Sequence, residues 1–160
     1  MSLKDLIFQK GGIGVSMSRA ETVARLNPII KQHMMLNHAY NDAIARLSDR
    51  TIADELAAQQ RTARMDVGKL METVLSAGGQ AYNGVDLEPD AFHLGDGDDD
   101  ILFALRDQEE AFLEMISDEL TPDHQMRSKA ILGVVENNSR QRFSLLKNHT
   151  NRRHRKISAA

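Results

Sequence analysis

Residues 79–100 read GQAYNGVDLEPDAFHLGDGDDD, and this stretch decides how the helices on either side of it are arranged. It has no helical period and is rich in Gly, Asp and Asn, which predicts a long connection. Fully extended, about 22 residues span roughly 70 Å, whereas a helix of about 28 residues is only about 42 Å long. The connection can therefore cross over between parallel helices of a bundle. We favour that arrangement over a simple up-down-up-down bundle.

Four segments with the apolar spacing of amphipathic helices flank this connection. Two are predicted before it, at about 28–48 and 50–77, and two after it, at about 99–119 and from Thr121-Pro122-Asp123 to about 150. Ser18 and Glu21 have capping-box spacing, but Asn27-Pro28 is a second start signal. Residues 18–26 are therefore interpreted as a separate turn of helix. The predicted organisation is an N-terminal extension (1–17), a four-helix bundle (18–150) and a basic flexible tail (151–160).

The composition excludes several kinds of site. The chain has 160 residues and no cysteine, which rules out disulfides, zinc–thiolate sites, iron–sulfur clusters and a thiol nucleophile. A net charge of -3 indicates no strong bias towards nucleic acid or an anionic membrane. No apolar run reaches signal-peptide length at the amino terminus or the roughly 18 residues of a membrane span. We expect a cytoplasmic protein with no membrane insertion.

Polar residues interrupt the predicted inner face of each helix near its middle. They are Asn37, Gln59, Glu109 and Ser139, of which only Glu109 is a carboxylate. Buried polar groups are normally hydrogen-bonded. We therefore interpret Asn37, Gln59 and Ser139 as a polar layer in the seam of the bundle, bonded to one another or to Glu109, that fixes the register of the helices.

Three stretches resemble a known family. They are LNPIIKQHMMLNHAYNDAIARL, the helix end ETVLSAGG, and LRDQEEAFLEMISDELTP followed by a long amphipathic helix. Together they resemble a family of small bacterial ferritin-like proteins of unassigned function, over about residues 26–150. The resemblance implies an all-α, ferritin-like four-helix bundle with a long crossover between its second and third helices. Family members tend to hold a carboxylate where Asn37 stands, and this chain departs from that pattern.

Ferritin-like oxidases, which the expected bundle also resembles, use Glu on the first and third helices and Glu-x-x-His on the second and fourth. In this chain the third-helix position is Glu109, whereas the fourth helix has Glu136 followed by Ser139 in place of His. The second helix has Gln59 and Gln60, followed three residues later by Thr62 and Ala63. The resemblance therefore implies a degenerate metal site.

A pair of iron or manganese ions needs several anionic oxygens, and Asn and Gln supply only neutral ones. Glu109 and Glu136, with His33 or Asp66, are one or two ligands short of an oxidase site. We interpret Glu109, Glu136 and His33 as the remaining metal-ligand candidates of a vestigial site. No catalytic or cofactor-binding residue is predicted.

Two function classes remain open at this point. The favoured one is a non-catalytic interaction or structural protein without a complete two-metal site, acting as a homo-oligomer, expected to be a dimer, with an unidentified protein partner. The alternative is an oxidase or store that binds iron or manganese with a reduced ligand set. The basic run Arg152-Arg153-His154-Arg155-Lys156 has no aromatic residues or groove-reading helix with it, so no specific nucleic-acid binding is expected.

Overall fold

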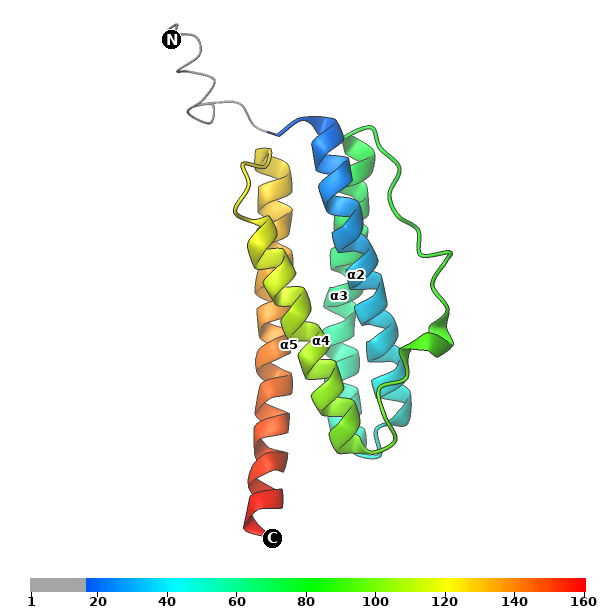
Figure 1. Cartoon of the computed structure of the whole chain (residues 1–160), viewed down its shortest axis with the longest axis vertical. Helices are drawn as coiled ribbons and strands as arrows, with labels where there is room; N and C mark the ends of the chain where they lie inside the picture. The colour runs from blue at the N-terminus through cyan, green and yellow to red at the C-terminus, as the bar shows by residue number, and fades with distance from the viewer. Residues whose placement is uncertain (1–16) are drawn as a thin grey trace, which may run out of the picture.

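Four long helices form an elongated bundle in the computed structural model, which describes residues 17–160 (Figure 1). They are α2 (Arg19–Arg46), α3 (Arg50–Ser76), α4 (Asp98–Glu119) and α5 (Met126–Ala159). A short 3-10 helix, η1 (Pro89–Phe92), interrupts the connection between α3 and α4. No strand occurs among these residues, so the all-α prediction is confirmed. The predicted N-terminal extension, apart from Met17, lies outside the described residues.

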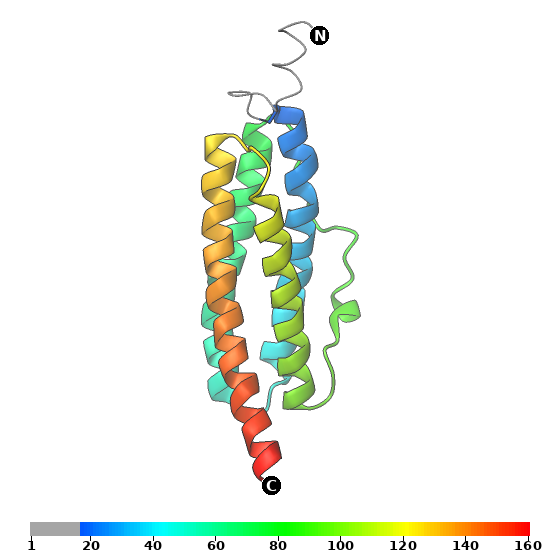
Figure 2. The same cartoon turned by 60° about the vertical axis from the view of Figure 1, so that its left-hand side comes forward.

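The predicted crossover is also confirmed. After α3 the chain returns along the outside of the bundle, so that α4 begins at the end of the bundle where α3 began (Figures 1 and 2). Helices α3 and α4 therefore run parallel. Helix α2 packs against α3 and α4, and α5 packs against the same two helices, which places α3 and α4 diagonally across the bundle. This is the topology of a ferritin-like bundle.

Helix α2 starts nine residues earlier than the sequence signals at Asn27-Pro28 predicted. The capping box at Ser18 and Glu21 forms in full, with the Ser18 hydroxyl accepting from the Glu21 amide and the Glu21 carboxylate accepting from the Ser18 amide. Pro28 lies inside the helix, where a proline costs about 3 kcal/mol. The hydrogen bonds of the capping box and the complete burial of Leu26 stabilise the first turns of the helix and offset that cost. The separate turn predicted for 18–26 was wrong.

Asn27 does not cap a helix. Its side chain binds the beginning of the crossover instead, because its amide nitrogen donates to the Gln80 carbonyl at 2.9 Å and its oxygen accepts from the Tyr82 amide at 2.8 Å. The residue that resembled a start signal thus ties the returning chain to the outside of α2.

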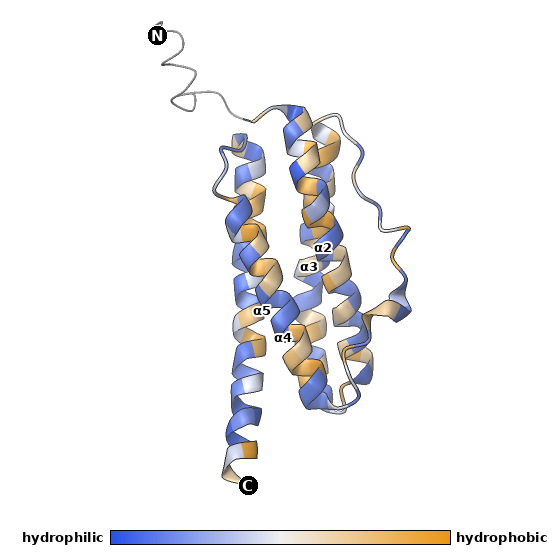
Figure 3. Cartoon of the chain, in the orientation of Figure 1, coloured by the Kyte–Doolittle hydropathy of each residue, from blue (hydrophilic) through white to orange (hydrophobic). Residues whose placement is uncertain are grey.

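Helix α5 differs from its prediction at both ends. It begins at Met126, because Thr121 closes a turn on Asp118 and the buried His124 donates from Nε2 to the carbonyl and carboxylate oxygens of Glu119 instead of entering the helix. It ends at Ala159, so the tail predicted to be flexible from residue 151 is helical. This last part of α5 is hydrophilic except for its final turn (Figure 3), and Arg153 pairs with Asp98 and Asp99 at the start of α4.

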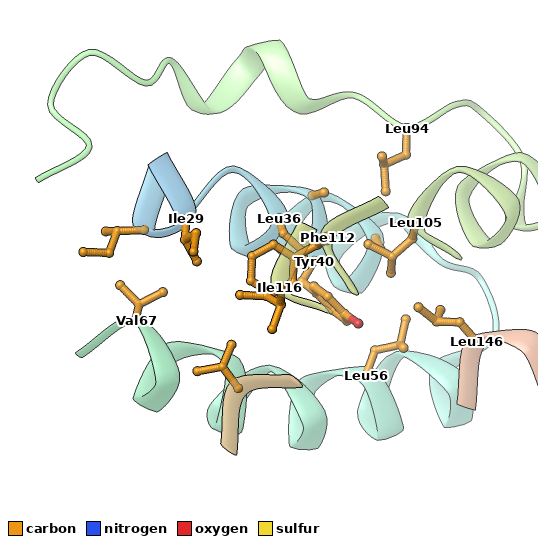
Figure 4. Close-up of a cluster of buried hydrophobic side chains, with 14 of the residues drawn as sticks. Ile29, Leu36, Tyr40, Leu56, Val67, Leu94, Leu105, Phe112, Ile116 and Leu146 are labelled. Atoms are coloured by element: carbon orange, nitrogen blue, oxygen red, sulfur yellow. The ribbon is translucent and has the colours of Figure 1, made fainter. Parts of the chain in front are cut away.

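The core is mainly aliphatic, with the aromatic rings of Tyr40 and Phe112 among its side chains (Figure 4). Every long helix contributes fully buried leucines, among them Leu26, Leu56, Leu105 and Leu146. Each such side chain contributes about 1.5–3 kcal/mol relative to exposure, so the apolar seams rather than helix propensity hold the bundle together. None of the helices between residues 17 and 160 is long and apolar enough to cross a membrane.

Asp98 joins the α2–α3 turn to the start of α4. Its carboxylate accepts from the Ser48 amide and hydroxyl, both at 2.8 Å, and from the Asp49 amide at 3.1 Å. Burial works to raise the pKa of Asp98, but the hydrogen bonds from Ser48 and Asp49 outweigh burial and lower it. Because the folded-state pKa lies below the unfolded one, the stabilisation is present above about pH 4 and is lost as pH falls through the folded-state pKa.

We expect Asp98→Ala to lower the free energy of unfolding at pH 7 by about 2 kcal/mol, because hydrogen bonds to a charged group are lost. Chemical denaturation at pH 7 measures this loss. Asp107→Ala, which removes an exposed carboxylate that pairs with the neighbouring Arg106, is the matched control and should stay within about 0.5 kcal/mol of the parent. Equal losses in the two variants would contradict the assigned role of Asp98.

Candidate functional site

Six polar side chains meet in the middle of the bundle, and each has at most 1% of its surface exposed. They come from all four long helices: His33 and Tyr40 from α2, Asp66 from α3, Glu109 from α4, and Ser139 and Arg142 from α5. We call them the central cluster. Figure 4 shows Tyr40 surrounded by the apolar side chains of the core. A charged group at such depth requires a partner.

The Glu109 carboxylate accepts four hydrogen bonds. Arg142 donates from Nε to both carboxylate oxygens, at 3.2 and 3.1 Å. The Tyr40 hydroxyl donates at 2.7 Å and the Ser139 hydroxyl at 2.6 Å. Burial raises the pKa of Tyr40 well above its ordinary value, and the Glu109 charge adds to this effect. Tyr40 therefore stays a neutral donor.

Asp66 lies on the other side of the Arg142 guanidinium. Its Oδ2 is 3.6 Å from Arg142 Nη1 and 3.8 Å from His33 Nε2, while its Oδ1 accepts from Asn138 at 2.9 Å. Burial works to lower the pKa of Arg142, but the nearby Glu109, Tyr40 and Asp66 together outweigh burial and raise it. The guanidinium thus stays charged and bridges two buried carboxylates.

The inward-facing pair on the fourth helix of the bundle is Ser139 and Arg142, three residues apart. Both contact Glu109, so α5 presents Ser-x-x-Arg at the spacing of a Glu-x-x-His ligand pair. Arginine has five donors and no acceptor, so it cannot ligate a metal ion. The sequence had suggested Glu136 and Ser139 as this pair.

Glu136 lies away from the cluster. It is partly exposed and accepts from the Ser117 hydroxyl and from Arg140, both at 2.8 Å. The structure therefore brings Glu109 and His33 into one cluster, together with Asp66, and does not bring Glu136 to them.

Of the predicted polar layer, Asn37 belongs to a separate hydrogen-bonded group together with Gln60 and Asn41. The sequence placed Gln59 in the seam of α3, but the structure buries its neighbour Gln60 and leaves Gln59 partly exposed. Gln60 donates to the Asn37 carbonyl at 3.0 Å and to the Asn41 side chain at 2.7 Å. Asn37 donates to the His33 carbonyl at 3.1 Å. Of the predicted layer, only Ser139 is bonded to Glu109.

The sequence analysis did not single out Arg142 and missed its role. The signal was its spacing: Arg142 is three residues after Ser139 and four before Leu146, so it shares the inner face with both. A charged residue at an inner position needs an internal counter-charge, which Glu109 supplied.

His33 packs its ring against Phe112, with the two ring centroids 4.4 Å apart. Burial lowers the pKa of His33, opposed by the nearby Asp66. Below about pH 6.5 the unfolded chain binds a proton at this residue more readily than the folded chain does. The stability contributed by His33 is therefore full above about pH 6.5 and is lost as pH falls through the folded-state pKa.

We expect the free energy of unfolding to fall between pH 7 and pH 5, with His33 contributing at most about 1.4 kcal/mol per pH unit. His33→Gln should flatten this slope, measured by chemical denaturation at a series of pH values. His38→Gln, on the partly exposed face of the same helix, is the matched control. A change of slope as large in that control would contradict the assignment.

The side chains of the cluster do not fit the two-metal centre that the ferritin-like topology implies. Within residues 17–160, no group of three or more His, Asp or Glu side chains is arranged to hold a metal ion. Glu109 already accepts four hydrogen bonds, and a guanidinium stands between it and Asp66. The centre of this bundle is arranged as a network of buried ion pairs.

Comparison with known proteins supports the fold. Neither a family model nor a curated protein matches the sequence. Among solved structures, the chain is similar to a dodecameric thioferritin, the bacterioferritin-related protein of Bacteroides fragilis, with a TM-score of 0.76 at 9% sequence identity. The match covers 90% of this chain and 92% of that one. The protein is therefore a ferritin-like four-helix bundle, and at this identity the similarity concerns the fold alone.

Proposed function

We propose that this protein is a non-catalytic ferritin-like bundle that serves as a structural or interaction protein and binds no two-metal centre. A single observation carries the proposal: the Arg142 guanidinium lies between the buried carboxylates of Glu109 and Asp66. It supplies the positive charge that metal ions supply in a two-metal bundle, and it supplies no ligand. No iron or manganese cofactor is part of this function.

The proposed protein is a cytoplasmic homo-oligomer. The structural neighbour is a dodecamer, which supports assembly of this chain with itself. Exposed apolar side chains, such as Met65 and Leu75 on α3, indicate where α3 can contact a further copy or another protein. Analytical ultracentrifugation distinguishes the dimer that we expect from a larger ring or shell, and a monomer at all concentrations would contradict self-assembly.

Elemental analysis of the purified protein tests the proposed absence of a metal centre. We expect less than about one iron or manganese per ten chains after purification without chelator. Thermal melts with Fe(II) under anaerobic conditions, with Mn(II), and with chelator should agree within about 1 °C, because a ligand that binds only the folded state would raise the melting temperature. Stoichiometric metal and a clear rise would instead indicate an oxidase or store with a reduced ligand set.

A further inference from the structure

A cavity of about 240 Å³ lies where the start of the crossover passes over α2 and α3, and it shares no residue with the central cluster. Its polar lining comes from three parts of the chain: Asn37, His38 and Asn41 from α2, Arg64 from α3, and Asn83 from the crossover. No Asp or Glu among residues 17–160 lines it. This volume equals that of about eight water molecules in the liquid, which is enough for a small organic molecule.

Arg64 gives the cavity a positive charge. Its Nη2 donates to Asn41 Oδ1 at 3.1 Å, and in the part of the chain that the structure describes it pairs with no carboxylate. A guanidinium is always charged, and its planar fork of N–H groups matches the two oxygens of a carboxylate. The charge at the cavity therefore favours an anionic ligand.

The amides beside Arg64 present donors to the cavity. Asn41 Oδ1 accepts from Gln60 at 2.7 Å as well as from Arg64, so the NH₂ group of Asn41 is the part left for a ligand. Asn83 Oδ1 accepts from the Val85 amide at 3.1 Å, which leaves the NH₂ group of Asn83 in the same way. Two NH₂ groups and a guanidinium together suit the oxygens of a carboxylate.

Asn37 adds a hydrogen-bond acceptor to this set of donors. Its Nδ2 donates to the His33 carbonyl at 3.1 Å, whereas its Oδ1 is buried and has no partner among the described residues. Buried polar atoms without partners are uncommon in folded proteins and call for a physical explanation. A hydroxyl or ammonium group of a ligand would supply the partner for Asn37.

The rest of the lining fits a short carbon chain. Met34 and Val67 form an apolar part of the wall. Gly84 brings the crossover close to Met34, because its φ is 73° and a Cβ at this position would lie 2.9 Å from Met34 Sδ. A site with an apolar wall and a few placed polar groups is typical of organic ligands, and an inorganic anion would make no use of that wall.

We propose that this cavity binds a small carboxylic acid whose neighbouring carbon carries a hydroxyl or an amino group. Arg64, with the NH₂ groups of Asn41 and Asn83, binds the carboxylate, and Asn37 accepts from the second group. The inference goes beyond the proposed function, because it gives the bundle a small-molecule ligand. The ligand contacts α2, α3 and the crossover at once, so its binding holds the crossover against the two helices.

A matched set of three-carbon probes tests the chemical class of the ligand. L-Lactate and L-alanine carry a carboxylate and a neighbouring donor, propionate lacks the donor, and lactamide lacks the charge. We expect L-lactate or L-alanine to raise the melting temperature by about 4 °C at a tenfold excess over its dissociation constant. Isothermal titration calorimetry should show propionate binding at least about threefold more weakly, and no binding of lactamide or inorganic phosphate.

Three results with these probes would overturn the proposal. The first is that neither L-lactate nor L-alanine binds at concentrations up to about 50 mM. The second is that lactamide binds as tightly as L-lactate, because the guanidinium would then play no part. The third is that phosphate binds as tightly as the organic acids, which would indicate a general anion site.

Asn41→Asp tests the location of the site while keeping the contacts of the natural side chain. The new carboxylate still accepts from Gln60 and Arg64, and its charge neutralises the guanidinium. We expect binding to weaken at least about tenfold, with no loss of melting temperature in the absence of ligand. Arg64→Gln should weaken binding by a similar factor. Arg61→Gln, at an exposed position three residues earlier on α3 and outside the cavity, is the matched control and should bind as the natural chain does.

Unchanged binding in both Asn41→Asp and Arg64→Gln would overturn the proposal, because the ligand would then be bound elsewhere. A loss in Arg61→Gln as large as that in Arg64→Gln would also overturn it, since the effect would then follow the overall charge of α3. Limited proteolysis gives a second measurement. The ligand should slow cleavage of the crossover near Asn83 in the natural chain and in Arg61→Gln, but not in Arg64→Gln, and equal cleavage with and without bound ligand would contradict the contact with the crossover.

Discussion

Glu109→Gln is expected to lower the free energy of unfolding by about 3–5 kcal/mol, the cost of leaving a buried charge without its partner. Arg142 has 1% of its surface exposed, and Glu109 is its closest counter-charge, at 3.1 Å. The glutamine oxygen can still accept from Tyr40 and Ser139, but its NH₂ group can only oppose the donors of the guanidinium. Urea or guanidinium denaturation at pH 7 measures the loss as a shift of the midpoint.

Glu110→Gln is the matched control, since it makes the same chemical change one residue further along α4 at an exposed position. It should change stability by no more than about 0.5 kcal/mol. A loss below about 1 kcal/mol in Glu109→Gln would mean that Asp66 alone balances Arg142, and the bridged arrangement of the cluster would then be wrong.

Arg142→Met is expected to cost about 3–5 kcal/mol as well, because it leaves the carboxylates of Glu109 and Asp66 buried without a cation. Methionine fills much of the same volume, so lost charge rather than a cavity accounts for the change. Arg140→Met, at an exposed position where the arginine pairs with Glu136, is the control and should cost no more than about 1 kcal/mol.

The double variant, Glu109→Gln with Arg142→Met, separates the interaction between the two residues from their individual effects. Its loss should be smaller than the sum of the single losses by about 2–3 kcal/mol, because the second change removes a charge that the first had left unpaired. Strictly additive losses would show that the two side chains do not stabilise one another in solution.

The fold was predictable from the sequence because its signals are local and repeated. Each helix buries one face, so its apolar residues recur at helical spacing, and residues 79–100 interrupt that spacing for long enough to span the bundle. The predictions of the fold that were wrong concerned the positions at which helices begin and end. Pro28 resembles a start signal, yet the capping box ten residues earlier and the packing of Leu26 keep the helix continuous.

The candidate site was only partly predictable. Helical spacing places Glu109 and Ser139 on inner faces, and their hydrogen bond agrees with that placement. The same spacing cannot decide between adjacent residues when the seam drifts around the helix axis, as at Gln59 and Gln60. Spacing also fails to decide between Glu136 and Arg142, because each lies three residues from Ser139, and the structure shows that Arg142 is the one that faces Glu109.

The sequence by itself determined that this chain forms four amphipathic helices with a crossover in the middle. Each of these features depends on the spacing of apolar and polar residues within a single segment of the chain. The tertiary structure decided which polar side chains meet. Glu109 and Arg142 are 33 positions apart, and Asp66 lies on a third helix. Their contact depends on how far each helix is shifted and rotated against its neighbours. Side-chain packing across the whole core sets that geometry, and no single segment encodes it.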